Sequence, residues 1–285
     1  MPELIHVSPR VAVLPPTHET DRPLLAAIHG TAKTLLIDAG NSPAHGTLFL
    51  RLLEAENIHP DGMVLTHHHW DHVFGLAAFD IPVVAHVNTR RRIEEMRMWS
   101  WTDAALAQRV QQRRQTAFTA ANIKKEWGDA RQVVLPAPTI TYTHQMTIDL
   151  GGTTCMLLHT NADHADDCTV IYLPEERTLF LGDALYADTM TWSYSSQGAL
   201  ALVETLERLE VDRCLLSHDD KPLERDAYQE WLRVMKHAGQ LVQQVPRNAP
   251  SLEDAVARKL GRLLTEEEAE IMGYFAAGIQ HERDD

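Results

Sequence analysis

The sequence has no apolar run that approaches the roughly 20 residues needed to cross a bilayer. Its start, Met1-Pro2-Glu3-Leu4-Ile5-His6, lacks the basic segment and the long apolar core of a secretory signal peptide. We therefore expect no membrane association and a cytoplasmic location.

Cysteine is scarce. The three cysteines, Cys155, Cys168 and Cys214, are odd in number, widely spaced and free of any C-x-x-C motif. This pattern does not indicate a disulfide framework or a structural zinc finger. We expect them to behave as small apolar residues in or near strands.

Positive charge is also in short supply. The chain has 26 Lys and Arg against 40 Asp and Glu, a formal net charge of −14. Such a balance argues against nonspecific nucleic-acid binding over the whole surface. Its 285 residues suffice for one large domain or for one domain with an appendage.

Short apolar runs separated by turn residues predict strands, which alternate with helices in the first half of the chain. The predicted strands cover residues 7–14, 24–29, 34–38, 63–65, 81–85, 132–135, 139–143, 147–150, 153–158, 169–173, 178–181 and 213–216. Ser42 can cap a helix with Pro43 at its first position, and residues 197–209 predict another helix. This alternation indicates α/β layering.

Residues 88–127 differ from their surroundings. They contain no proline and no strand-like run, and Leu106, Val110, Ala117 and Ala121 fall at helical spacing. Their nine Lys and Arg against four Asp and Glu give a net of +5, which leaves −19 for the remainder. We expect a helical insertion here. Its Met and Trp residues either line an apolar pocket or serve packing or a homodimer interface: Met96, Met98, Trp99 and Trp101.

The chain after Pro222 is predicted to be helical. Ser251–Asp254 resembles a helix-capping box, and Thr265–Glu268 is a complete one. The domain prediction is therefore a domain over 1–222, insertion included, with a helical C-terminal extension over 223–285 packed on it.

The most informative segment is Thr66–His72, which has the pattern H-x-H-x-D-H after a short apolar run. In an extended chain alternate residues point the same way, so His67 and His69 can reach one ion while His68 points away. Asp71 and His72 follow where the chain turns into a helix, and they can face a second ion. Imidazole and carboxylate together predict a metal site.

Further ligands are expected where later strands end. Candidates are His164, with His159 as a rival on the same loop, then Asp183 and His218. All can converge on one edge of a sheet sandwich.

With these motifs the chain resembles the metallo-β-lactamase superfamily of αββα hydrolases. His67-x-His69-x-Asp71-His72 is the most specific match, and Phe180–Asp183 and Ser217-His218 are similar to later family segments. By this resemblance, His67, His69 and His164 hold one metal, Asp71, His72 and His218 hold the other, and Asp183 bridges them. The sequence departs from the family pattern in two places. Asn161-Ala162-Asp163 precedes His164, and Ser217 and Asp219 flank His218.

The resemblance implies a dinuclear metallohydrolase, with zinc as the usual metal and iron or manganese as alternatives. A metal-bridged hydroxide would cleave an ester, lactone or thioester of a small molecule, and Asp71 would help to orient it. Tyr186, three residues after Asp183, is placed as in acyl-homoserine lactone lactonases, where such a tyrosine contacts the substrate oxygen. The alternative is that Tyr186 is a half-buried tyrosine beside the site with no contact to the substrate.

Several other functions stay open. They are a phosphodiesterase or nuclease of the same superfamily, a glyoxalase II, a mononuclear iron persulfide dioxygenase and a non-catalytic, metal-stabilised binding protein. The acidic balance disfavours the nuclease, and the absence of a signal peptide disfavours a secreted β-lactamase.

Overall fold

Alternate side chains of the first strands enter two different cores, which places these strands in the middle of a layered structure. In β3 (Leu25–His29), Leu25 and Ala27 pack on one side, and Ala26 and Ile28 on the other. A strand buried on both faces needs a layer of structure against each. The computed structural model supplies both layers and describes residues 2–129, 131–246 and 248–281.

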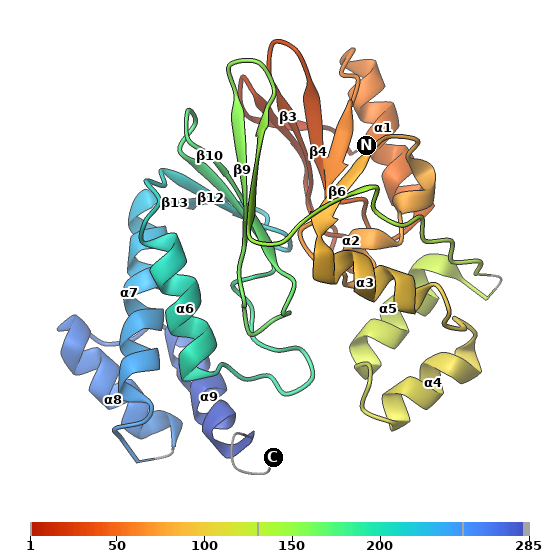
Figure 1. Cartoon of the computed structure of the whole chain (residues 1–285). Helices are drawn as coiled ribbons and strands as arrows, with labels where there is room; N and C mark the ends of the chain where they lie inside the picture. Colours follow the sequence, from red (N-terminus) through yellow and green to blue (C-terminus); the bar gives the residue numbers. More distant parts are fainter. Residues whose placement is uncertain (1, 130, 247, 282–285) are drawn as a thin grey trace.

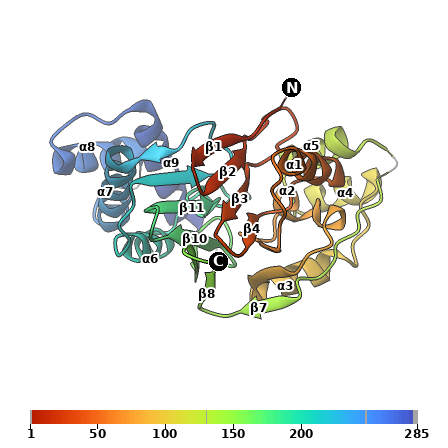
Figure 2. The ribbon, with the colours of Figure 1, turned by 90° about the horizontal axis from the view of Figure 1, so that it is seen from above.

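Two sheets face one another (Figures 1 and 2). The first has the spatial order β1 (Ile5–Ser8), β2 (Val11–Leu14), β3, β4 (Thr34–Ile37), β5 (Gly62–Val64), β6 (Val83–His86) and β7 (Ile140–Tyr142). The second has the order β13 (Leu223–Glu224), β12 (Arg213–Leu216), β11 (Thr178–Gly182), β10 (Thr169–Leu173), β9 (Thr154–His159) and β8 (Gln145–Asp149).

Helices cover both outer faces (Figures 1 and 2). On the first sheet lie α1 (Pro43–Ala55), α2 (Trp70–Val73), α3 (Val87–Met96), α4 (Asp103–Gln111) and α5 (Ala117–Trp127). On the second lie α6 (Ser196–Leu206), α7 (Arg225–Leu241), α8 (Ala249–Leu260) and α9 (Glu266–His281). The αββα architecture, the helical insertion and the helical C-terminal part are as the sequence predicts. No helix in these described ranges is long and apolar enough to cross a membrane.

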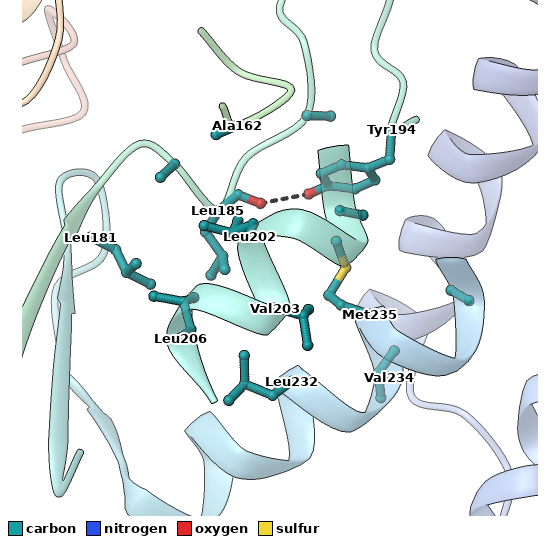
Figure 3. Close-up of a cluster of buried hydrophobic side chains, with 14 of the residues drawn as sticks. Ala162, Leu181, Leu185, Tyr194, Leu202, Val203, Leu206, Leu232, Val234 and Met235 are labelled. Atoms are coloured by element: carbon teal, nitrogen blue, oxygen red, sulfur yellow. Dashed lines mark hydrogen bonds between the residues drawn. The ribbon is translucent and has the colours of Figure 1, made fainter. Parts of the chain in front are cut away.

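Three buried clusters hold these layers together. One lies between the sheets, a second joins the first sheet to α1 and the insertion, and the third joins the second sheet to α6–α9. Figure 3 shows part of the third, where Leu202 and Leu206 of α6 meet Leu232 and Met235 of α7. The helices after Pro222 thus share a continuous apolar core with the second sheet, while the division of the chain into two domains stays a prediction.

Two local predictions were wrong. Residues 132–135 form no strand, because Pro136 and Pro138 follow them and cannot donate to a sheet ladder. The helix α8 begins before Ser251, since the Asn248 side chain accepts a hydrogen bond from the Ser251 backbone amide. The capping box of Thr265 is confirmed: its hydroxyl accepts from the Glu268 amide, and the Glu268 carboxylate accepts from the Thr265 amide.

Candidate metal centre

The carboxyl ends of parallel strands meet at one edge of the sandwich. β4, β5 and β6 run parallel in the first sheet, and β11 and β12 run parallel in the second. Every candidate ligand from the sequence except the rival His159, the last residue of β9, lies on a segment that follows β5, β9, β11 or β12. The loop after β5 is joined to the start of β10 by a hydrogen bond from the Thr169 amide to the Thr66 carbonyl, 2.7 Å.

A glycine allows the two sheets to approach at this edge. Gly182, the last residue of β11, has φ +56°, and a Cβ there would lie 2.9 Å from the Cβ of Thr66. Any other residue would force the two strand ends apart and strain the backbone. Because Asp183 follows directly, this contact sets how far its carboxylate lies from the histidine segment.

The first candidate ligand group contains His67, His69 and His164. Nε2 of His164 lies 2.9 Å from Nδ1 of His69. Burial, reinforced by the neighbouring imidazoles, holds the pKa values of His67 and His69 well below the ordinary value. These two rings are therefore neutral, the form in which imidazole binds a metal.

The second candidate group contains Asp71, His72, Asp183 and His218. Oδ2 of Asp71 lies 3.1 Å from Nε2 of His72 and 3.2 Å from Nε2 of His218. Burial opposes the charge of His72 and His218, but the carboxylates outweigh it, raising the pKa of His218 to about 10 and that of His72 well above its usual value. Without a metal these rings carry protons that a metal ion would have to displace.

Asp183 lies between the two groups. Its Oδ2 atom is 3.3 Å from Nε2 of His164, 3.4 Å from Nε2 of His72 and 3.5 Å from Nε2 of His218. The same atom is 3.8 Å from Nε2 of His67. One carboxylate thus approaches histidines of both groups, which is the placement expected of a bridging ligand.

Several buried atoms of the donor set lie near opposite charge but form no hydrogen bond within the described ranges. Nε2 of His67, Nε2 of His72 and Oδ1 of Asp183 are buried and form no hydrogen bond within the described ranges. A buried polar atom without a partner costs free energy, so each such atom calls for an explanation. Nitrogen and carboxylate donors facing one small volume fit divalent metal ions.

An orienting carboxylate was missed by the sequence reasoning, which assigned Asp38 only to the end of a strand. Its Oδ2 accepts from Nδ1 of His72 at 2.8 Å, and its Oδ1 accepts from the Thr66 amide at 2.7 Å. A carboxylate on the outer nitrogen fixes the ring and leaves the other nitrogen for a metal. The feature that could have identified Asp38 is its position at the carboxyl end of β4, the strand beside β5.

A second carboxylate, Asp21, was also missed. It lies on the loop between β2 and β3, with Oδ1 3.6 Å from Nδ1 of His218. Burial and the nearby Asp71 raise the pKa of Asp21 to about 6. No sequence pattern marks it, because 197 residues separate it from the histidine that it faces.

The structure places His68 and His159 outside both groups. Nδ1 of His68 lies 2.9 Å from Oδ1 of the buried Asp167. The His159 ring stacks on that of His86, at 3.7 Å between centroids, and its Nε2 bonds to the Asp166 carbonyl. The alternation argument thus holds for His68, and the rival ligand His159 points away from the site.

Tyr186 lies beside both groups. Its ring centroid is 6.2 Å from that of His164 and 6.1 Å from that of His218, and its hydroxyl donates to Asp219 at 3.4 Å. Burial and the Asp183 charge raise the pKa of Tyr186, which keeps the phenol protonated. The loop behind it is held by the Tyr194 hydroxyl, which donates to the Leu185 carbonyl (Figure 3).

The apolar residues of the insertion divide between core and surface. Met96 and Trp101 are buried, and Trp101 packs edge-on against Phe74. Met98 and Trp99 are exposed, with Arg109 stacked over the Trp99 ring. Packing therefore accounts for two of the four residues.

Comparison with known proteins identifies the family. The model of the metallo-beta-lactamase superfamily matches residues 25–218, which contain every candidate ligand. The chain belongs to the metallo-beta-lactamase superfamily. A comparison with curated protein sequences finds no match.

Several solved structures share the fold. An inverting sec-alkylsulfatase from Pseudomonas has a TM-score of 0.67 at 17% identity, covering 99% of this chain and 50% of its own. This chain thus spans about half the length of that alkylsulfatase. A metallo-beta-lactamase from Pontibacter korlensis has a TM-score of 0.58 at 17% identity, and the match covers 83% of this chain and 99% of that protein. A metallo-beta-lactamase family protein from Thermus thermophilus has the same TM-score and identity, and the match covers 98% of this chain and 94% of that protein.

Proposed function

We propose that the chain is a hydrolase that uses two divalent metal ions, zinc above all, to cleave an ester, lactone or thioester bond of a small molecule. The observation that carries the proposal is the Asp183 carboxylate, one oxygen of which lies within 3.8 Å of ring nitrogens from both ligand groups. The family, whose members are mostly metal-dependent hydrolases, supports the same assignment.

The residues divide between the two ions as follows. His67, His69 and His164 would hold one ion, Asp71, His72 and His218 the other, and Asp183 would contact both. Zinc suits this mixture of imidazole and carboxylate, and iron and manganese bind such donors as well.

Bound there, a pair of divalent ions would polarise the substrate oxygen and lower the pKa of a water molecule enough to supply hydroxide near neutral pH. Asp71 stays ionised, because His72 and His218 outweigh its burial and hold the pKa of its carboxyl below the usual range. It can therefore orient the attacking water by accepting a hydrogen bond from it. By turning away from Asp219, the protonated hydroxyl of Tyr186 can donate its hydrogen bond to the oxyanion that forms on the substrate.

The test combines metal analysis with a substrate panel. Purified protein would be assayed for metal equivalents and then for hydrolysis of carboxylic esters, lactones, thioesters, phosphodiesters and alkyl sulfates. The proposal expects two equivalents and turnover of at least one of the first three classes. Two bound metals with no hydrolysis of any class would favour a metal-stabilised binding protein instead.

Sulfate-ester hydrolysis is a second candidate, because the alkylsulfatase structure overlays nearly the whole chain. Turnover confined to alkyl sulfates would establish it. An iron persulfide dioxygenase would instead bind one iron and consume oxygen. Nucleic acid is not proposed as a partner, and a homodimer through the insertion stays a proposal to be tested by the oligomeric state.

A further inference from the structure

The insertion holds the loop that carries Asp21. Two backbone hydrogen bonds between Thr17 and Arg22, 2.9 and 3.0 Å long, close this loop. Asp21 has φ +58° there and directs Oδ1 to within 3.6 Å of Nδ1 of His218. The position of Asp21 relative to His218 therefore depends on what holds residues 17–22.

Glu126, in the last turn of α5, binds the residues on either side of Asp21. Its carboxylate accepts from the Thr20 hydroxyl at 2.6 Å and from Nη2 of Arg22 at 2.7 Å. It also accepts from the Ser42 hydroxyl at 2.5 Å, at the start of α1. Only 3% of the Glu126 side chain is exposed, and its donors outweigh burial to lower the pKa of its carboxyl.

The neighbours of Glu126 reinforce this contact. Nζ of Lys125 donates to the Glu19 carbonyl at 2.8 Å. The indole nitrogen of Trp127 donates to the Asn41 carbonyl, and the Asn41 side chain donates to the Thr20 carbonyl, each at 2.8 Å. The last turn of α5 is thus joined to the loop through side chains and backbone.

We infer that Glu126 is a positioning residue that holds Asp21 against His218 and so sets the affinity of the second ligand group for its metal ion. The inference rests on the proposed function, because it requires His218 to bind a metal. A carboxylate beside the outer nitrogen of a ligating histidine fixes the ring and raises its basicity. The helical insertion would then act on the site through this loop, whose Arg22 lies 104 residues from Glu126 in the sequence.

The test uses Glu126→Gln, which keeps the shape of the side chain and removes its charge. Metal-free protein would be titrated with Zn²⁺ against a chelating dye, and His218→Ala would identify the step that belongs to the second group. We expect that step to weaken about 10-fold, at the lower end of the effect of losing an orienting partner. The Zn²⁺-binding step that belongs to the first ligand group should keep its wild-type affinity.

Two controls make the result specific. Glu94→Gln removes an exposed carboxylate of the same insertion, bonded to Arg90 at 2.9 Å, and both steps should stay at wild-type affinity. Asp21→Asn should weaken the same step as Glu126→Gln, and the double variant should lose no more than the larger single loss. This non-additivity is expected only if Glu126 acts through Asp21.

Each outcome decides the question. Wild-type affinity in Glu126→Gln, or losses that add in the double variant, would overturn the inference and leave the proposed function standing. A wild-type protein that binds no second equivalent would overturn both. If Glu126→Gln does not fold, Thr20→Val removes a single donor, and it should weaken the same step by a smaller factor. An unchanged step there would overturn the inference.

Discussion

Asp38 and His72 form a hydrogen bond across 34 residues of sequence, with Oδ2 of the carboxylate 2.8 Å from Nδ1 of the ring. Both side chains are buried, and Nε2 of His72 faces the candidate metal centre without a hydrogen-bond partner among the described residues. The carboxylate therefore fixes which nitrogen of His72 is left for a metal.

Asp38→Asn should weaken metal binding about 10–100-fold, the usual effect of losing such an orienting partner. Asparagine tolerates the left-handed backbone of this position, φ +60°, so the fold should persist. Metal titration of the variant checks this. Asp61→Asn is the matched control, because Asp61 accepts from the Thr34 amide at the opposite end of β4. Equal affinities in the two variants would contradict the assignment.

His68→Ala should keep both metals and lose stability. The imidazole bonds to Asp167, whose carboxylate is fully buried, and removing one partner leaves a buried acceptor unsatisfied. We expect the free energy of unfolding to fall by about 1–3 kcal/mol. Denaturant titration and metal analysis measure the two quantities, and His68→Gln, which can still donate, should recover part of the stability. Loss of one metal equivalent would show that His68 is a ligand.

Tyr186→Phe should lower kcat by about 10–100-fold, because removal of an oxyanion donor has effects of this order or larger. Metal content should stay unchanged, since the hydroxyl lies outside both ligand groups. Tyr172→Phe, which removes a hydroxyl bonded to the Glu210 carbonyl, is the control. An unchanged kcat in Tyr186→Phe would assign the residue to packing.

His45 should make the metal-free protein sensitive to acid. Burial, reinforced by the Arg22 charge, lowers its pKa to about 3, whereas an unfolded chain has a value near 6.5. The unfolded state therefore takes up a proton first as the pH falls. The stability that the neutral ring contributes is complete above about pH 6.5 and is lost toward pH 3, by up to about 1.4 kcal/mol per unit.

His45→Asn should remove this component. Unfolding free energies measured at pH 7, 6 and 5 with a chelator present should fall more steeply for the wild type than for the variant. Parallel pH dependences would mean that His45 is not the group responsible.

The candidate ligands were predictable because each lies in or just after a strand, where periodicity fixes the direction of the side chain. Their orienting partners were not. Asp38 and Asp21 look like ordinary loop carboxylates until the strands that separate them from His72 and His218 are placed. The net charge of the insertion was similarly uninformative, because its contact with the site region is made by one acid, Glu126, together with Lys125 and Trp127.

The layering was predictable from the same alternation, but local chemistry overrode it in places. The apolar run at 132–135 reads as a strand, yet the prolines that follow prevent pairing. The start of α8 was misplaced because Asn248 caps it ahead of the Ser251 motif. In both places two neighbouring sequence patterns predict different structures, and the tertiary structure shows which one forms.

If Asp183 joins two metal sites, its removal should release metal, and the metal content of Asp183→Ala measures this. We expect wild-type protein to bind two equivalents and the variant to lose metal, with turnover reduced by more than about 100-fold, beyond the loss of an orienting partner. Asp166→Ala, an exposed carboxylate 3.5 Å from Arg92, is the control and should retain both metals. Full activity with two bound equivalents in Asp183→Ala would show that Asp183 does not join two metal sites.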